Sequence, residues 1–337
     1  MKIVFFEVLK TDQAFFGEVF KGAEVSFFEE KLSEHDVEKA KDADIISIFV
    51  NSEINKNIID ALPNLKFIVT RSTGYDHIDI SYCKEKGILV SNIPAYGSQT
   101  VAEFTFALLL SLSRRIFWGY YQLRDGTNFD LSQLEGFDLE GKILGVIGTG
   151  KIGQNVIRIA KGFRMNVIAT DPHPNTELTK ELGFEYVTLD DLLSQSDVVT
   201  IHVPYLPETH HLINSTNLSK IKKGAVLINT ARGEIVETEG MLAALNDGRI
   251  KGVGLDVLEG ERDLKEERTM IMDSEPKIEQ MESMRKLVED HILIDMPNVV
   301  VTPHMAFFSK EAVGRIMQTT VDNINNFIAG NGQNLVK

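Results

Sequence analysis

The chain has little cysteine and no long apolar segment. Cys83 is its single cysteine, so an intrachain disulfide is excluded, and we expect a reducing, cytoplasmic setting. Its most apolar stretch, FTFALLLSLS, is about half as long as the roughly 20 residues that a bilayer-spanning helix needs. The N-terminal MKIVFFEVLK reaches Glu7 and Lys10 too early for the apolar core of a signal peptide. We therefore expect neither export nor a membrane partner.

Positive charge is also scarce. The chain has 35 Lys and Arg against 49 Asp and Glu, for a formal net charge of -14. Because affinity for nucleic acid depends mainly on Lys and Arg that neutralise phosphates, we expect no nucleic-acid partner. We also predict no metal site. With 337 residues, 43% of them hydrophobic, the chain is long enough for two globular domains.

Short β-branched and aromatic runs alternate with polar segments of helical character. One series runs from KIVFFEV to GILVSN and a second from KILGVIGTG to NVVVTPH. This alternation predicts βα units, and the nearly continuous apolar runs are typical of parallel sheets covered on both faces. The last segment, residues 309–330, has the pattern of one amphipathic helix, which we expect to return to the first domain.

Two further segments are predicted to be helical. Thr100 and Glu103 have the spacing of a capping box at the start of a long buried helix. Residues 261–291 form a charged, methionine-bearing insertion between two predicted strands. We interpret this insertion as a solvated helical segment, with a functional lid as the alternative.

The stretch GVIGTGKIG contains Gly148, Gly150 and Gly153 in the spacing G-x-G-x-x-G, between a predicted strand and a predicted helix. The next apolar run ends at Asp171, which is the context expected of a dinucleotide-binding loop. Asp171 would accept hydrogen bonds from the ribose hydroxyls and repel a 2′-phosphate, so NAD is favoured over NADP, although His173 leaves NADP open. The competing interpretation is a tight turn in which Asp171 only caps a helix.

In the second series, polar residues follow directly after the apolar runs. Parallel sheets of this kind bind ligands beyond the carboxyl ends of their strands, where these residues are expected to lie. They include His202, Arg232, Asp256, Glu261 and His304. Arg232 can hold a carboxylate, and His304 can exchange a proton with a carbonyl or hydroxyl oxygen. Glu261 can pair with the imidazole and favour its charged form. Each alone is more often structural, but beside a dinucleotide motif the set predicts carbonyl reduction.

The sequence resembles the D-isomer-specific 2-hydroxyacid dehydrogenase family almost from end to end. The resemblance rests on RSTGYDHID, PAYGSQTVAEFTFALLL, GVIGTGKIG, HVPYLPETHHLIN, LINTARGEIVET, GLDVLEGE and VVVTPHMAFF. It implies an α/β fold of two doubly wound parallel-sheet domains. A Rossmann NAD-binding domain, residues 99–305, would be inserted into a flavodoxin-like substrate domain formed by residues 1–98 and 306–337.

The resemblance also implies functional residues. The family's catalytic Arg, Glu and His fall on Arg232, Glu261 and His304, which the strand ends had already indicated. The backbone of Thr73 and Gly74 would bind the substrate carboxylate, and Tyr96 would close over the substrate. Asp256 is expected to hold the nicotinamide carboxamide. The implied cofactor-binding residues are Gly148, Gly150, Lys151, Ile152, Gly153, Asp171, His202, Val203, Pro204, Thr209, Thr230, Ala231 and Asp256.

Within the family, the sequence is similar to the D-lactate dehydrogenase branch in three features. Arg262 stands in place of a common proline, the charged insertion is present, and Phe307 and Phe308 follow the histidine. This implies reversible reduction of pyruvate, or a similar small 2-keto acid, with NADH, and a homodimer formed through the cofactor domain. Residues 49–51 depart from the branch, so substrate size stays open. Hydroxypyruvate or glyoxylate reductase and 2-hydroxyisocaproate dehydrogenase are alternatives, and an NAD(H)-sensing scaffold is the non-enzymatic one.

Overall fold

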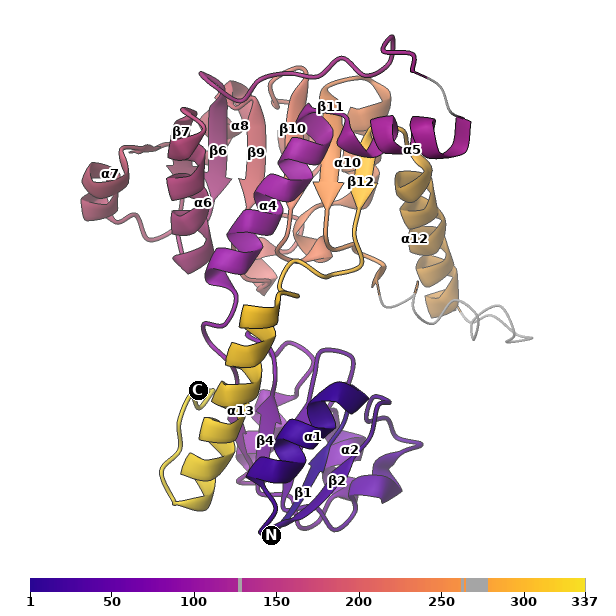
Figure 1. The fold of residues 1–337 in the computed structure, drawn as a ribbon, viewed down its shortest axis with the longest axis vertical. Coiled ribbons are helices and arrows are strands. Elements are labelled where there is room, and N and C mark those ends of the chain that lie inside the picture. The colour runs from indigo at the N-terminus through magenta and orange to yellow at the C-terminus, as the bar shows by residue number, and fades with distance from the viewer. Residues whose placement is uncertain (127–128, 262–263, 265–277, 337) are drawn as a thin grey trace. The chain divides into compact units, whose positions relative to one another are not determined.

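The computed structural model describes residues 1–126, 129–261, 264 and 278–336, without the side chains of residues 278–283. The chain forms two compact units. Unit 1 consists of Met1–Gly97 with Phe308–Lys337, and unit 2 of Ser98–Phe307. The colours in Figure 1 show that unit 1 contains both the start and the end of the chain.

Unit 1 is built on a five-stranded sheet in which all strand pairs are parallel. Its spatial order is β2-β1-β3-β4-β5. The strands are β1 (Lys2–Phe5), β2 (Glu24–Phe27), β3 (Ile45–Ile48), β4 (Phe67–Thr70) and β5 (Leu89–Ser91). This is the flavodoxin order, so the predicted fold class is confirmed for this unit. The strand order reverses between β1 and β3, and this place is the topological switch point of the sheet.

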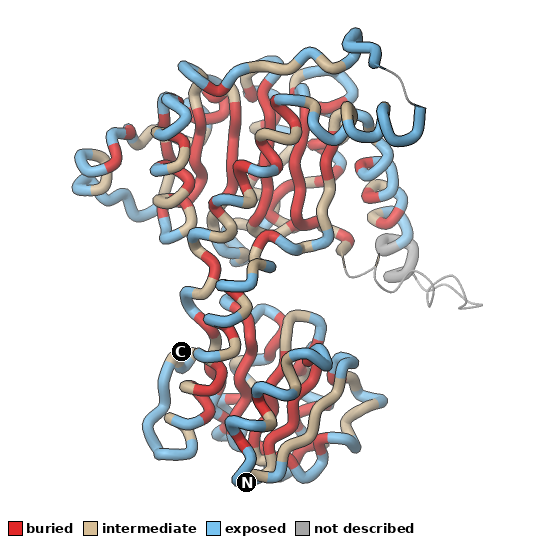
Figure 2. The backbone as a smooth tube through the Cα atoms, in the orientation of Figure 1, coloured by how far each residue is buried: buried red, intermediate tan, exposed pale blue. Residues whose placement is uncertain are grey.

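Helices cover both faces of this sheet. On one face lie α1 (Lys10–Val19) and the C-terminal α13 (Lys310–Ile328), and on the other α2 (Lys56–Ala61) and α3 (Ile80–Glu85). Successive residues of β1 point to opposite faces, because Ile3 and Phe5 join the first cluster and Val4 and Phe6 the second. The alternation leaves both faces of β1 buried. Figure 2 shows buried residues along the central strands of this sheet.

Unit 2 is built on a seven-stranded parallel sheet with the order β12-β11-β10-β9-β6-β7-β8. Its strands are β6 (Ile143–Ile147), β7 (Asn166–Thr170), β8 (Glu185–Tyr186), β9 (Val198–Ile201), β10 (Ala225–Asn229), β11 (Ile250–Leu255) and β12 (Val299–Val301). The order is that of a Rossmann sheet with one added strand, which confirms the predicted class. The strand order reverses between β6 and β9.

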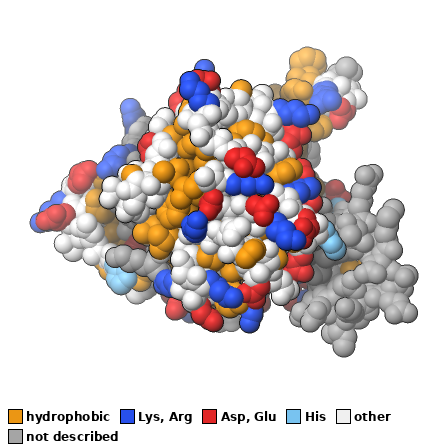
Figure 3. Space-filling view, turned by 90° about the horizontal axis from the view of Figure 1, so that it is seen from below, with side chains coloured by type: hydrophobic (Ala, Val, Ile, Leu, Met, Phe, Trp, Pro, Cys, Tyr) orange, Lys and Arg blue, Asp and Glu red, His pale blue; other side chains and the backbone are white. Residues whose placement is uncertain are grey.

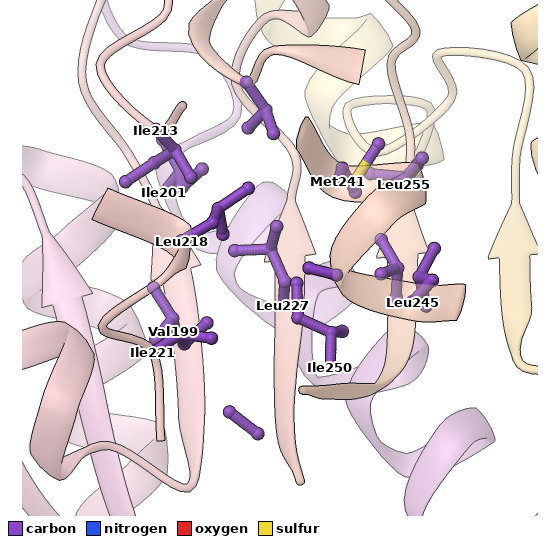
Figure 4. Packing of buried hydrophobic residues seen from close by; sticks show 14 of the residues in the cluster. Val199, Ile201, Ile213, Leu218, Ile221, Leu227, Met241, Leu245, Ile250 and Leu255 are labelled. Atoms are coloured by element: carbon purple, nitrogen blue, oxygen red, sulfur yellow. The ribbon is translucent and has the colours of Figure 1, made fainter. Parts of the chain in front are cut away.

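Two hydrophobic clusters flank this second sheet. One contains residues of α4 (Ser98–Ser113) and α6 (Lys151–Gly162). The other contains residues of α8 (Leu189–Gln195), α9 (Ser215–Leu218) and α10 (Thr238–Asn246). Figure 4 shows residues of α9 and α10 packed with residues of β9, β10 and β11. Among the described residues, unit 2 also contains the α-helices α5 (Ile116–Gly126), α7 (Thr176–Leu182) and α12 (Ile278–Asp295).

Two helix predictions need correction. Helix α4 begins at Ser98, so Thr100 is already helical and the predicted capping box at Thr100 is wrong. The first part of the charged insertion lies outside the described residues, and its last part forms α12. This helix packs against α10 and β12, and its Leu287 and Leu293 are buried. One face of α12 therefore belongs to the core and is not solvated as predicted.

The surface mixes charge of both signs. Figure 3 shows Lys and Arg side chains interspersed with Asp and Glu, and a band of hydrophobic side chains between them on the face in view. Among the described residues, no helix combines the length and the apolar character needed to cross a membrane. Helix α5 has no buried residue.

Candidate functional site

The glycine loop follows β6 at the switch point of the second sheet. Gly148 has a left-handed φ of 95°, and a Cβ on it would lie 2.7 Å from the carbonyl oxygen of His202. A Cβ on Gly153 would lie 2.0 Å from the carbonyl oxygen of Gly148. Both positions therefore require glycine for close packing. By contrast, a Cβ on Gly150 would meet nothing within 4 Å, so this glycine borders open space at the start of α6.

That open space fits a dinucleotide pyrophosphate. Gly150 is the N-cap of α6 and makes no side-chain cap, so the first N–H groups of a twelve-residue helix face it together with the positive end of the helix dipole. Lys151 is exposed and Ile152 is half-buried in the first helical turn. The loop thus combines two glycines that packing requires with a third that leaves room for a ligand.

Asp171 lies beside this loop, just after β7. Its Oδ2 accepts hydrogen bonds from Thr149 N at 2.7 Å and Thr149 Oγ1 at 3.0 Å, and its Oδ1 accepts from His173 N at 2.8 Å. Burial alone would raise the pKa of Asp171, but these donors outweigh it and hold the pKa below its ordinary value. The carboxylate is therefore ionised, as an acceptor for ribose hydroxyls needs to be.

His202 and Val203 directly follow β9, the strand next to β6 at the switch point, and so lie beside the glycine loop. The His202 ring keeps some accessible surface, but it is densely enclosed, and burial lowers its pKa to about 3. Its Nε2 lies 2.9 Å from Thr200 Oγ1. His202 is therefore a neutral hydrogen-bonding ring at physiological pH and not a proton donor.

The depressed pKa of His202 predicts a pH dependence of stability. Because the unfolded ring binds a proton near pH 6.5 and the folded ring only near pH 3, the native state loses stability as pH falls from about 6.5 to 3, by up to about 5 kcal/mol. We expect His202→Gln, which does not titrate, to reduce the fall in Tm between pH 7 and pH 4.5. His173→Gln, on the exposed loop after Asp171, serves as control. Parallel curves for wild type and His202→Gln would contradict this account.

Arg232 lies in the loop that follows β10. Asn229, at the buried strand end, accepts a hydrogen bond from Ala231 N at 3.0 Å and donates one to the Arg232 carbonyl oxygen at 2.8 Å. A Cβ on Gly233 would lie 2.1 Å from the backbone of Leu258, so only glycine allows this approach. The Arg232 loop is thereby packed against the segment that carries Glu261.

His304 and Glu261 form a pair at the same sheet edge. His304 Nδ1 lies 3.0 Å from Glu261 Oε2 and 3.1 Å from Oε1, and each side chain is 25% exposed. His304 has a left-handed φ of 54°, a conformation that is uncommon outside glycine and recurs at functional sites. Because Glu261 holds Nδ1, Nε2 is the ring nitrogen that would exchange a proton with a ligand.

Asp256 fixes the turn on which His304 lies. Its Oδ1 accepts from Thr302 Oγ1 at 2.6 Å and Met305 N at 2.9 Å, and its Oδ2 accepts from Ala306 N at 2.7 Å. The Asp256 carbonyl oxygen accepts from His304 N at 2.8 Å. Burial raises the pKa of Asp256 even though these donors oppose the shift. Sequence reasoning assigned Asp256 a contact with the cofactor, and the structure adds this role in positioning the histidine turn.

The remaining predicted residues of unit 2 lie around these loops. Thr230 Oγ1 is 3.1 Å from Thr105 Oγ1 of α4, and Thr209 Oγ1 donates to the Pro204 carbonyl oxygen at 2.7 Å. Ala231 and Val203 are half-buried, whereas Pro204 is exposed.

The three predicted substrate residues lie in unit 1. Thr73 Oγ1 donates to the Ile93 carbonyl oxygen at 2.7 Å, and Ser72 Oγ donates to the Gly74 carbonyl oxygen at 2.6 Å. The carbonyl oxygen of Tyr96 accepts from Arg315 Nε. The loop of Thr73 and Gly74 is therefore held in one conformation, with Thr73 exposed.

Sequence reasoning missed Glu259. Its buried carboxylate lies 2.9 Å from His211 Nε2 and 3.0 Å from Lys286 Nζ, and it accepts from Thr238 Oγ1 at 2.8 Å. Burial would raise its pKa, but these partners lower the pKa to about 2. The sequence signal was the first acid in LEGE, two residues before Glu261. Glu259 anchors the segment that presents Glu261.

Comparison with known proteins identifies relatives along the whole chain. A family model described as D-isomer specific 2-hydroxyacid dehydrogenase, NAD binding domain, matches residues 106–306. D-lactate dehydrogenase of Escherichia coli is 36% identical over 334 residues, covering 98% of each chain.

Solved structures give the same result. D-lactate dehydrogenase of Aquifex aeolicus, complexed with NAD and lactic acid, has a TM-score of 0.87 and 36% identity, covering 97% of this chain and 96% of that one. A D-2-hydroxyisocaproate dehydrogenase has a TM-score of 0.83 and 32% identity, covering 100% of this chain and 99% of that one.

Proposed function

Because the chain belongs to the D-isomer-specific 2-hydroxyacid dehydrogenase family, a family of NAD-dependent oxidoreductases, we propose that it reduces pyruvate, or a similar small 2-keto acid, to the D-2-hydroxy acid with NADH. The reaction is reversible. The observation that carries the proposal is the contact between Glu261 and His304 Nδ1, at the sheet edge that also holds the glycine loop.

Substrate binding rests on one charged side chain and on backbone donors. Arg232 holds the substrate carboxylate with its guanidinium fork and also polarises the keto oxygen. The N–H groups of Thr73 and Gly74 bind the same carboxylate, and Tyr96 closes over the substrate. The exposure of Thr73 and the hydrogen bonds that fix its loop support this assignment.

Proton transfer rests on His304. Glu261 holds Nδ1 and orients the ring, and Nε2 delivers its proton to the keto oxygen as that oxygen gains negative charge. When bound, NADH supplies the hydride that C2 of the keto acid receives. The loop shaped by Gly148, Gly150 and Gly153 would hold the pyrophosphate beside Gly150. Asp171 would hold the ribose and Asp256 the nicotinamide carboxamide.

Substrate size is tested by a panel of 2-keto acids. We expect the highest kcat/KM for NADH oxidation with pyruvate, compared with glyoxylate, hydroxypyruvate and 2-ketoisocaproate. A preference for 2-ketoisocaproate would favour the hydroxyisocaproate alternative, to which the similarity to a solved D-2-hydroxyisocaproate dehydrogenase gives some support. Tight NADH binding without turnover of any 2-keto acid would instead favour the NAD(H)-sensing scaffold.

Asp171 is expected to set the preference for NADH over NADPH. Its ionised carboxylate would repel a 2′-phosphate, so Asp171→Asn should raise the NADPH to NADH ratio of kcat/KM by at least about tenfold, or ~1.4 kcal/mol. Glu177→Gln removes an equal charge from the exposed start of α7 and serves as control. The account would fail if both variants shifted the ratio equally.

We also propose a cytoplasmic homodimer formed through unit 2. Helix α5 supports this, because Ile116, Phe117 and Tyr120 are 57%, 45% and 58% exposed, and an apolar patch of this kind is typical of an interface. We expect the 37.7 kDa chain to elute as a dimer and Tyr120→Lys to dissociate it. Val19→Lys, on the exposed side of α1, is the matched control. A wild-type monomer at micromolar concentration would refute the dimer.

A further inference from the structure

The switch point of the unit 1 sheet carries an unusual residue that the proposed mechanism does not use. Glu7 lies two residues after the end of β1, the strand that neighbours β3 in the sheet. Its backbone has a left-handed φ of 55°. A glutamate in this conformation is strained by roughly 1–2 kcal/mol relative to an ordinary backbone conformation. Such strain persists only where the surroundings hold the residue, and it recurs at ligand sites.

The Glu7 carboxylate binds the loop that follows β3. Its Oε2 accepts from Phe49 N at 3.0 Å, Ser52 N at 3.1 Å and Ser52 Oγ at 2.5 Å. Its Oε1 accepts from Asn51 N at 3.0 Å and Asn51 Nδ2 at 2.8 Å. Both oxygens are thus used to define one loop, residues 49–52, and charge-assisted bonds of this kind are about twice as strong as neutral ones.

Arg71, directly after β4, binds the backbone that follows β1. Its guanidinium is buried and donates to the carbonyl oxygens of Phe6 at 2.6 Å and Glu7 at 2.8 Å, and to Ser47 Oγ at 2.8 Å. Burial lowers the pKa of Arg71 to about 10, and the negative charge of Glu7 opposes that shift. Arg71 is therefore still charged at neutral pH, and it fixes the backbone from which Glu7 reaches the loop.

The position of this loop indicates what it is for. In open parallel sheets, ligands bind beyond the carboxyl ends of the strands at the switch point, which in unit 1 lies between β1 and β3. The loop of Thr73 and Gly74 follows β4, the next strand in the sheet. Phe49 and Val50 are half-buried and Asn51 is exposed, so the loop presents both apolar and polar surface.

We propose that Glu7 is a positioning residue that holds residues 49–52 as one wall of the keto-acid site, and thereby limits the size of the substrate side chain. This inference rests on the proposed function. Glu7 does not touch the reacting atoms. Its effect is on which 2-keto acids fit and how tightly they bind, and it leaves proton transfer and NADH binding unchanged.

The test uses Glu7→Gly and Glu7→Gln in the full-length chain. Glycine accepts the left-handed backbone without strain, so Glu7→Gly removes the carboxylate while keeping the chain path. Glutamine keeps the side-chain length but removes the charge. It also replaces one of the two acceptor oxygens with an NH₂ group, which cannot accept from the loop donors. Glu29→Gly makes the same substitution at an exposed bend of unit 1 and serves as control.

We expect Glu7→Gly to raise KM for pyruvate about tenfold and to shift the preference between pyruvate and 2-ketoisocaproate toward the larger acid by about tenfold, the size of effect that one or two methylenes produce in a pocket. The kcat at saturation and the Kd for NADH should stay within about twofold of wild type. Glu7→Gln should fall between wild type and Glu7→Gly, and the control should match wild type.

The outcomes separate this inference from the proposed function. Absence of turnover by the wild type with every 2-keto acid would refute the proposed function. Normal wild-type turnover, with an unchanged KM and substrate preference in a folded Glu7→Gly, would overturn the role of Glu7 alone. If Glu7→Gly does not fold, a Glu7→Gln variant with wild-type KM and preference overturns it equally.

Discussion

Replacing His304 is expected to lower kcat by about 10²–10⁴-fold, the range typical of a lost general acid, while KM for pyruvate and Kd for NADH change little. Without the imidazolium, the keto oxygen must take its proton from water as it gains charge. The substrate carboxylate contacts and the glycine loop are untouched by this change, so binding should persist.

The left-handed backbone of His304 dictates the choice of variants. His304→Asn tolerates a positive φ better than His304→Ala, so similar losses in both would assign the effect to the lost imidazole and not to strain. His173→Ala, on an exposed loop of the same unit, is the control. Near-normal kcat in a folded His304→Asn would remove His304 from the mechanism.

Arg232→Ala is expected to lower kcat/KM by about 10²–10³-fold, or about 3–4 kcal/mol, because the substrate carboxylate would lose its charged partner. KM should rise and kcat should fall together, since the guanidinium also polarises the keto oxygen. Arg232→Lys should recover only part of the loss, because lysine keeps the charge but not the two-pronged geometry.

The matched control for Arg232 is Arg249→Ala. Arg249 lies in the same unit, and its guanidinium pairs with Asp247 at the surface. Wild-type kcat/KM in Arg249→Ala together with the expected loss in Arg232→Ala would assign the effect to the substrate contact. A wild-type KM in Arg232→Ala would contradict it.

Much of the fold follows from local patterns. The apolar run of β1 predicted a strand of a parallel sheet, and that of β10 a parallel strand buried on both faces. The spacing of Gly148, Gly150 and Gly153 predicted a loop whose packing the structure explains. These features depend on residues close together in the chain. The start of α4 and the buried face of α12 were not predicted correctly, because both depend on contacts beyond the local pattern.

The residues that support the site could not be predicted from the sequence either. Glu7 binds residues more than forty positions away, and Glu259 binds His211 from a different loop. Glu7 lies in no recognised motif, and in the motif GLDVLEGE a role was assigned to Glu261 and not to Glu259. Glu261 follows β11 and His304 follows β12, and the pairing of these two strands brings the Glu261 carboxylate to 3.0 Å from the His304 ring.

The configuration of the product tests the central claim most directly. With NADH and pyruvate, the account predicts stoichiometric NADH oxidation and lactate that is entirely the D enantiomer by chiral chromatography. Formation of L-lactate or of a racemic mixture, or no NADH oxidation with pyruvate or any other 2-keto acid, would contradict it.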